Sequence, residues 1–456
     1  MSFLDILGAV NNFVWGPWML TLLVGTGVFL TVRLGFMQVS SLPYALKLAF
    51  SKSQDDKSGG DITHFQALMT ALAATIGTGN IAGVATAFVM GGPGAIFWMW
   101  VTAFFGMATK YGEAILAIKY RVKDENGNMA GGPMYYIEKG LGWKWLGWAF
   151  AFFGAVAAFG IGNMVQTNSV ADVVHSNFGV PMWVTGAILA ALTAAVILGG
   201  IKSIGRVTGI IVPFMAVFYV AAGLIILLIN IGAVPAALGL IFTDAFTGQA
   251  VAGGALGAVI RWGVARGVFS NEAGLGSAPI AAAAAKTDHP GRQALVSMTG
   301  TFLDTIVVCS ITGLALTIAG MKGVVAEGLE GAPLTAASFG GLLPGEIGSY
   351  LVTIGLIFFA YSTVLGWSYY GEKCFQYMFG SKGIILYRWA FVLVAFWGAT
   401  QSLDTVWFIA DTLNGAMAVP NLIGLLFLSG VIVSETKKFN EIRKKEKGET
   451  STGISA

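Results

Sequence analysis

The chain has 456 residues, of which 56% are hydrophobic and only 11% are charged, and its mean hydropathy is +0.75. Soluble domains carry roughly 25% charged residues, so this composition excludes a soluble globular protein and indicates an integral membrane protein. The net charge is only +3 and the basic residues are scattered, which gives no reason to expect a nucleic-acid partner.

A membrane-spanning helix needs about 20 mostly apolar residues, and eleven segments of the chain meet this requirement. The predicted spans are 14–35, 65–90, 94–118, 146–176, 181–199, 208–231, 250–283, 293–319, 346–372, 384–400 and 403–433. Cytoplasmic loops hold most lysines and arginines, and with the N-terminus outside only Lys322 falls in an outer loop. We therefore predict an all-α protein with about 11 transmembrane helices, its N-terminus outside and its C-terminus cytoplasmic.

Polar clusters interrupt four of these spans, although unpaired polar groups are costly in hydrocarbon and tend to mark function. They are "TIGTGN" at 75–80, "NMVQTNSVAD" at 163–172, "RWGVARGVFSNEAGLGSAP" at 261–279 and "AYSTVLGW" at 360–367. Small residues also allow helices to pack closely. In "GTGN", however, threonine and asparagine add hydrogen-bonding groups, which favours an unwound helix. Four interrupted helices predict one shared polar cavity.

The spans divide into an extra first helix and two sets of five, and each set opens with its most glycine-interrupted helix. An odd number of spans in each set inverts the second copy across the membrane. We predict an extra helix and cytoplasmic loop at 1–64, a first repeat at 65–231, a second, inverted repeat at 250–433 and a basic cytoplasmic tail at 434–456. Paired interrupted helices in inverted repeats are typical of secondary transporters of the leucine-transporter fold.

An unwound turn exposes backbone groups that can bind ions of both signs. Amides at the start of the following half-helix attract a carboxylate, and carbonyls at the end of the preceding half attract a cation. We therefore expect a substrate carboxylate at the amides of Thr78 and Gly79. Carbonyls of Ala73 and Ile76, with hydroxyls from another helix, could hold a hard monovalent cation.

Two long motifs carry a resemblance to a known family. "GGPGAIFWMWVTAFFG" at 91–106 and "RGVFSNEAGLGSAP" at 266–279 closely resemble signatures of the alanine or glycine:cation symporter family, and the likeness extends over nearly the whole chain. This resemblance implies a leucine-transporter-type fold. It also implies transport of small neutral amino acids, chiefly alanine and glycine, with sodium or sometimes protons.

The resemblance also implies roles for individual residues. At the sodium site, the carbonyls of Ala73 and Ile76 would face Ser362 and Thr363. The substrate site would comprise Thr75, Thr78, Gly79, Asn80, Gln166, Phe269, Ser270, Asn271 and Trp367, with Phe269 to Asn271 at the second break. One sodium ion is expected, and no resident cofactor.

Further polar residues have expected partners. Glu272 is expected to act as a gate or helix cap paired with Arg261 or Arg266, and a proton-coupling carboxylate is the alternative role for it. Lys110 and Glu113, one helical turn apart, are expected to form a structural pair. Cys309 and Cys374 have no metal-ligand spacing and are expected to be inert core thiols.

We therefore expect a symporter that imports alanine or glycine with sodium by alternating access, working as a monomer in the lipid bilayer of a prokaryotic-type cell membrane. A proton-coupled symporter is one alternative and an ion channel is another. A membrane enzyme is not expected, because the sequence shows no nucleophile–base or metal constellation.

Overall fold

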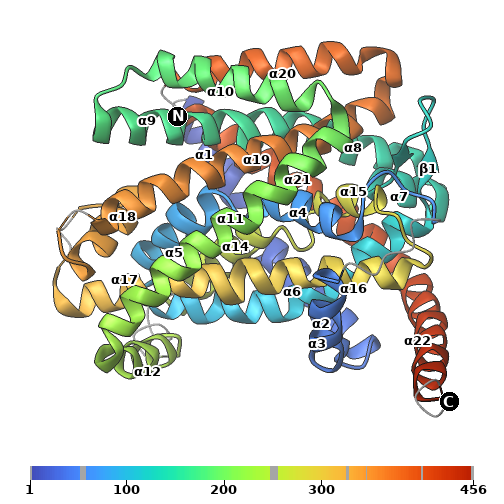
Figure 1. Ribbon diagram of the computed structural model, residues 1–456, viewed down its shortest axis with the longest axis horizontal. Helices are drawn as coiled ribbons and strands as arrows, with labels where there is room; N and C mark the ends of the chain where they lie inside the picture. The colour runs from blue at the N-terminus through green and yellow to red at the C-terminus, as the bar shows by residue number, and fades with distance from the viewer. Residues whose placement is uncertain are drawn as a thin grey trace.

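The computed structural model describes residues 3–51, 58–246, 255–324, 328–345, 347–401 and 404–452. Within these ranges the chain is almost entirely helical (Figure 1). One small antiparallel hairpin pairs β1 (Val122–Lys123) with β2 (Met129–Ala130). Residues 250–254, where the predicted seventh span and second repeat begin, and the end of the predicted tail at 453–456 lie outside the described residues.

The α-helices in chain order are α1 (Phe3–Val14), α2 (Pro17–Arg33), α3 (Met37–Ala49), α4 (His64–Thr75), α5 (Val84–Gly91), α6 (Gly94–Lys119), α7 (Pro133–Leu141), α8 (Lys144–Phe159), α9 (Val165–Phe178), α10 (Met182–Ile197), α11 (Gly200–Ile229), α12 (Val234–Asp244), α14 (Ala255–Asn271), α15 (Ala278–Ala283), α16 (Pro290–Thr301), α17 (Ser310–Lys322), α18 (Gly331–Leu342), α19 (Ile347–Phe379), α20 (Ile384–Gly398), α21 (Asp404–Phe427) and α22 (Ser429–Thr452). Three π-helical segments join helices in series: η1 (Gly79–Gly83), η2 (Gly160–Met164) and η4 (Phe302–Cys309). Two short 3₁₀ turns, η3 (Ile231–Ala233) and η5 (Ser381–Gly383), precede α12 and α20.

The helices have the length and surface of a multi-pass membrane protein. In the described residues six helical stretches are long and apolar enough to cross a membrane, and a bent seventh is added if α4 and the segment 79–91 form one span. Each of the eleven predicted ranges contains a helix or a series of helices. Large apolar side chains such as Ile210 and Leu386, each 70% exposed, lie on the outside, as expected where the surroundings are lipid.

Helix α4 begins with a capping box and ends at the predicted break. The Thr63 hydroxyl accepts from the Gln66 amide, and the Gln66 side chain accepts from the Thr63 amide, which satisfies two amides that a helix start leaves free. The helix ends at Thr75, because Ile76 has an extended backbone (φ −76°, ψ 94°). The chain then resumes at η1 with a bend of 52°.

A second break separates α14 from α15. It begins at Glu272, which has a left-handed backbone (φ 56°), and Gly274 and Gly276 follow with φ of 92° and 85°. Phe269, Ser270 and Asn271, which were predicted to lie at the second break, form the end of α14 directly before it. The left-handed backbone at Glu272 ends α14 at Asn271, because a right-handed helix does not continue through a residue with positive φ.

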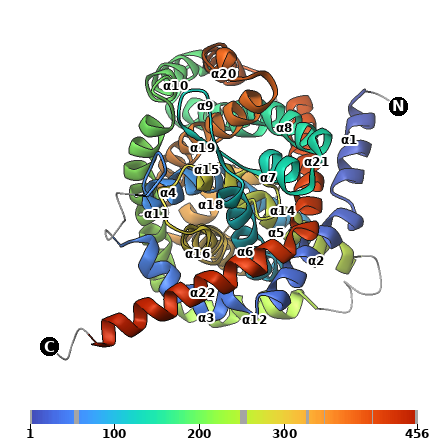
Figure 2. The same ribbon diagram turned by 90° about the vertical axis from the view of Figure 1, so that its right-hand side faces the viewer.

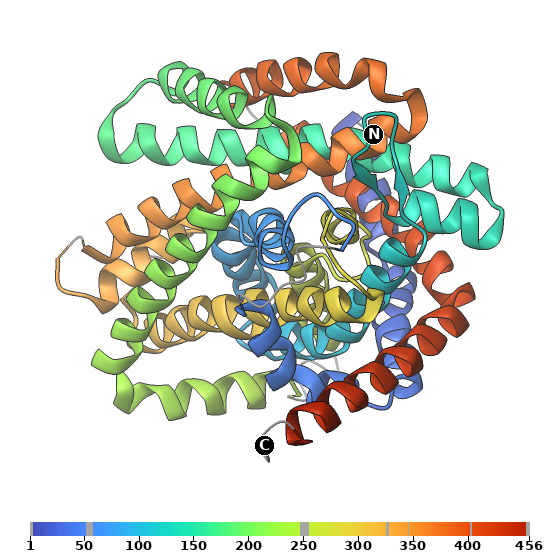
Figure 3. The same ribbon diagram turned by 45° about the vertical axis from the view of Figure 1, so that its right-hand side comes forward.

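The two broken helices lie at the centre of the molecule. Figure 3 shows α4 and α5, in blue, surrounded by the other helices. Helix α4 packs on α11, α15 and α19, and α14 packs on α5 and α6. Helix α22 crosses one end of the molecule and packs on α6 and α16 (Figure 2).

Candidate functional site

At the break in α4, side chains take over the hydrogen bonding of the unwound backbone. The Gly77 amide donates to Oδ1 of Asn80 over 2.9 Å. A Cβ atom on Gly77 would lie 2.4 Å from Oγ1 of Thr363, so only glycine lets α19 approach the break this closely. The unwound turn thus brings a neighbouring helix into contact with the backbone of α4.

Four buried oxygen atoms converge where α4 ends. Oγ1 of Thr363 lies 3.1 Å from the carbonyl oxygen of Ala73 and 3.5 Å from that of Ile76. Oγ of Ser362 lies 3.3 Å from the Ala73 carbonyl oxygen. Both hydroxyls also reach the Phe359 carbonyl oxygen, as membrane serines and threonines often do. Two hydroxyls and two carbonyls at the negative end of a helix form a donor set suited to a hard cation, and these are the four residues named from the sequence.

Gln166 reaches the other side of the break. Its Nε2 donates to Oγ1 of Thr78 over 3.1 Å and to the Ile161 carbonyl over 3.0 Å. Its Oε1 is buried and has no hydrogen-bond partner in the structure. Gln166 is the second residue after η2, so this π segment sets the side on which it stands. The structure therefore brings Gln166 next to Thr78 and Gly77.

Asp304 joins the two broken helices and was missed in the sequence analysis. Its Oδ1 accepts from Nδ2 of Asn80 over 2.7 Å, and its Oδ2 accepts from the hydroxyls of Ser270 (2.9 Å) and Thr305 (2.8 Å). The carboxyl is fully buried, and among the described residues no basic side chain lies within ion-pair distance of it. The only sequence signal was that Asp304 is the one charged residue in the span 293–319.

Of the other predicted substrate residues, Asn271 and Phe269 contact residues of the site, and Thr75 does not. Asn271 donates from Nδ2 to Oγ1 of Thr305 over 3.1 Å. The Phe269 ring lies against Gly79, where a Cβ atom would be 3.3 Å from the ring. Thr75, in contrast, donates only to carbonyls of the preceding turn of its own helix and makes no bond to the others.

Trp367 packs beside the break from α19. A Cβ atom added to Gly162 would lie 2.2 Å from Cβ of Trp367. This glycine of η2 is therefore required for the close packing of Trp367 on η2. The Trp367 side chain also interacts with Glu272. Trp367 therefore stands between the π segment η2 and the second break.

Two buried side chains of α6 hold the second break, and the prediction that they pair with each other was wrong. Nζ of Lys110 donates to the Asn271 carbonyl over 2.7 Å at the end of α14. Oε1 of Glu113 accepts from the amides of Gly274 and Gly276, each over 3.1 Å. Because the broken backbone exposes both carbonyl and amide groups, each side chain binds the group of opposite polarity instead of the other side chain.

The prediction that Glu272 pairs with an arginine was also wrong. Its Oε2 accepts from the Ser277 hydroxyl over 2.6 Å. Arg261 donates to Oδ1 of Asn12, and Arg266 lies over the rings of Trp262 and Phe269. The left-handed backbone at Glu272 turns its carboxylate across the break, while the arginines lie earlier on α14.

Cys309 and Cys374 are both buried and free. In the residues that the structure describes, no three histidine, cysteine, aspartate or glutamate side chains are grouped to hold a metal ion.

Comparisons with known proteins agree on one family. The model of the sodium:alanine symporter family matches residues 1–452. The sodium/alanine symporter AgcS of Methanococcus maripaludis is 75% identical over 451 residues, which cover 98% of this chain and 99% of that protein. The probable sodium/glutamine symporter GlnT of Bacillus subtilis is 38% identical, over 96% of this chain and 91% of that protein. The crystal structure of MhsT in complex with L-phenylalanine is similar in fold, with a TM-score of 0.58. MhsT has the leucine-transporter fold. The two sequences are 15% identical, and the match covers 83% of this chain and 98% of that chain.

Proposed function

Because the chain belongs to the sodium:alanine symporter family, we propose that it imports a small neutral amino acid, alanine or glycine, together with sodium by alternating access. The protein is a transporter and not an enzyme. The observation that carries the coupled mechanism is the group of four oxygens that Ala73, Ile76, Ser362 and Thr363 place at the break in α4.

Sodium would bind among these four oxygens and hold α4 against α19. The substrate carboxylate would lie on the amides of Thr78 and Gly79, which begin the next half-helix, with Gln166 close by. The substrate amino group would meet the Phe269 to Asn271 end of α14. Ion and substrate would then stabilise the same closed arrangement of α4, so each would raise the affinity for the other.

The architecture proposed with this mechanism is that of two inverted five-helix repeats and one extra N-terminal helix. Eleven crossings, with the N-terminus outside and the C-terminus in the cytoplasm, place the basic residues on the inner side. The two broken helices, α4–α5 and α14–α15, occupy corresponding positions at the start of each repeat, where such transporters bind their substrates. One polypeptide contributes every residue of this site, which supports a functional monomer.

Asp304 favours a second candidate, coupling to protons. It is a fully buried carboxyl that contacts both broken helices and has only neutral hydrogen-bond donors. A carboxyl of this kind within a membrane is a candidate proton carrier. Under this alternative, Asp304→Asn would abolish uptake that is driven by a proton gradient without sodium.

Uptake of labelled alanine into liposomes that contain the purified protein tests both candidates. A sodium gradient, a proton gradient and no gradient are compared, each with and without Asp304→Asn. Sodium-driven accumulation is expected. Accumulation driven only by protons would favour the second candidate, and no accumulation of any small amino acid under any gradient would contradict the proposal. Currents far above the turnover of a transporter would instead indicate a channel.

A further inference from the structure

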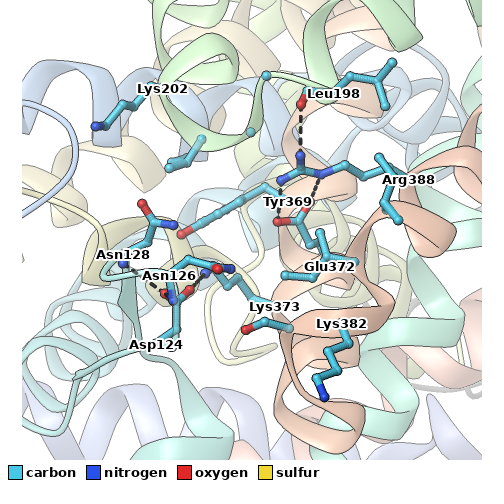
Figure 4. Close-up of a pocket in the computed structure, with 16 residues that line it drawn as sticks. Asp124, Asn126, Asn128, Leu198, Lys202, Tyr369, Glu372, Lys373, Lys382 and Arg388 are labelled. Atoms are coloured by element: carbon cyan, nitrogen blue, oxygen red, sulfur yellow. Dashed lines mark hydrogen bonds and ion pairs between the residues drawn. The ribbon is translucent and has the colours of Figure 1, made fainter.

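A polar cavity of about 410 Å³ lies away from the breaks (Figure 4). Four parts of the chain form it: the β1–β2 hairpin, the start of α11, the last part of α19 and the start of α20. None of the residues proposed to bind substrate or sodium lines it. The cavity therefore needs an explanation of its own.

Four cationic and two acidic side chains line this cavity, and both acidic groups are neutralised within it. Oδ2 of Asp124 pairs with Nζ of Lys373 over 3.0 Å. The Glu372 carboxylate accepts two hydrogen bonds from Arg388, of 2.6 and 2.9 Å. Figure 4 shows both pairs on the walls of the cavity. Two positive charges are left over.

Those charges belong to Lys202 and Lys382, both exposed. In the described part of the chain neither lysine forms an ion pair at contact distance or a hydrogen bond. Lys202 interacts at longer range with Asp61, which does not line the cavity. Figure 4 shows them at opposite edges of the cavity. Their long side chains are free to turn toward a ligand between them.

Two helix starts face the same cavity. Helix α11 begins at Gly200 after Gly199, and α20 begins at Ile384 after Gly383. Neither start has a side chain that caps its amides. Uncapped amides and the positive end of the helix dipole attract anions, and here two such ends are combined.

Tyr369 gives independent support for a ligand. The residue is only 1% exposed, and its hydroxyl has no hydrogen-bond partner in the structure. Figure 4 shows its ring extending across the cavity, with the hydroxyl toward Asn128. Buried hydroxyls nearly always have a partner, so a ligand in the cavity would satisfy this one.

We propose that this cavity binds a phosphate group. A phosphate carries up to two negative charges, which match Lys202 and Lys382, and it offers several acceptor oxygens for ammonium, phenol and amide donors. The group belongs either to the headgroup of an acidic phospholipid or to a soluble phosphate ester. Ile385, which lines the cavity, and the neighbouring Leu386 are exposed apolar residues, which is compatible with a lipid. The proposal is independent of the transported substrate.

Binding to the full-length protein tests this proposal. Inorganic phosphate is titrated calorimetrically against protein in detergent, with sodium chloride of equal ionic strength as the reference. In parallel, the thermal unfolding of protein in phosphatidylcholine vesicles is compared with that in vesicles that also contain phosphatidylglycerol. Saturable binding or stabilisation is expected in at least one arm. Binding of inorganic phosphate without stabilisation by phosphatidylglycerol would identify a soluble ester as the ligand. Stabilisation by phosphatidylglycerol without binding of inorganic phosphate would identify a lipid headgroup.

Variants then locate the site. The double variant Lys202→Ala/Lys382→Ala is expected to bind about a hundredfold more weakly, since each lost charge-assisted hydrogen bond weakens binding about tenfold or more. Tyr369→Phe is expected to weaken binding several-fold without lowering the unfolding temperature of the free protein, because its hydroxyl has no partner there. Lys139→Ala, which removes an exposed lysine outside the cavity, is the control.

Each variant is titrated with phosphate at a temperature below its own unfolding transition, so that a loss of binding is not caused by unfolding. The absence of saturable binding in both arms would overturn the proposal. An equal loss in Lys139→Ala would also overturn it, since the attraction would then come from surface charge in general.

Discussion

Oγ1 of Thr363 lies 3.1 Å from the carbonyl oxygen of Ala73, so the middle of α19 meets α4 where α4 stops being helical. The contact joins the end of a helix to a side chain of a distant span. The Ala73 carbonyl oxygen also accepts from the Ser362 hydroxyl over 3.3 Å. The proposed sodium ion would bind at this junction.

Removing one of these oxygens is expected to weaken the dependence on sodium. Thr363→Ala should raise the sodium concentration for half-maximal alanine uptake about tenfold, equivalent to about 1.4 kcal/mol, and should change uptake less at saturating sodium. Ser368→Ala on the same helix removes a buried hydroxyl that bonds only to the Leu365 carbonyl and should leave sodium dependence unchanged. Equal sodium dependence in Thr363→Ala and the wild type would argue against a cation at this position.

Lys110 is expected to be essential for the second break. Lys110→Met leaves the Asn271 carbonyl without its charged donor, so the protein should lose about 1.5–3 kcal/mol of stability and most of its transport. Thermal unfolding in detergent and alanine uptake measure the two effects. Lys119→Met on the same helix removes the ion pair between the exposed Lys119 side chain and the buried Glu435, which keeps Lys438 as a second partner, and should change stability by less than about 1 kcal/mol. If Lys110→Met were as mild as Lys119→Met, the Lys110 contact would have no structural role.

The close contact of α4 with α19 depends on Gly366. A Cβ atom there would lie 2.8 Å from the Ala74 amide nitrogen, so Gly366→Ala must push the two helices apart. We expect a loss of about 1–3 kcal/mol of stability and a higher sodium requirement, read from thermal unfolding and uptake. Gly25→Ala, in a helix with nothing within 4 Å of the added atom, should be neutral. A normal sodium requirement in Gly366→Ala would contradict the proposed junction.

Acidification is expected to loosen the end of the protein that α22 covers. Burial lowers the pKa of His289, and the positive charges of Lys438 and Arg292 lower it further. The negative charges of Glu435 and Asp288 raise it but offset the lowering only in part. The Glu435 Oε2 atom lies 3.4 Å from Nε2 of His289. The unfolded chain therefore takes up this proton at a higher pH than the folded protein, and stability is lost as the pH falls below the ordinary histidine value of about 6.5.

The same histidine can be replaced without removing its helix cap. Nδ1 of His289 accepts from the Gly291 amide, and asparagine can cap a helix in the same way. His289→Asn should therefore show a smaller drop in unfolding temperature between about pH 7 and about pH 5 than the wild type. Identical pH profiles would assign the acid sensitivity to other groups.

How far the sequence predicts this molecule depends on whether a feature is local. The break in α4 was predictable because glycine, threonine and asparagine in the middle of an apolar run cannot sustain an ordinary helix. The grouping of Ala73 and Ile76 with Ser362 and Thr363 followed from the family resemblance. It could not be deduced from spacing, since these pairs are almost 290 residues apart.

Contacts between distant helices were not predictable in the same way. Asp304 is a single carboxyl in an apolar run, and its partners Asn80 and Ser270 come from two other helices. Lys110 and Glu113 looked like a local pair because they are one turn apart. The exposed backbone of the second break, which no local pattern reveals, determined their actual partners.

The π segment η2 makes the site sensitive to changes in chain length. A π turn accommodates one additional residue, and one residue corresponds to about 100° of helix rotation. A deletion within Gly160–Met164 would leave the hydropathy of this span nearly unchanged. It would nevertheless turn Gln166, the second residue after this segment, away from Thr78. Alignments of distant relatives that place a gap here would therefore pair residues pointing in different directions.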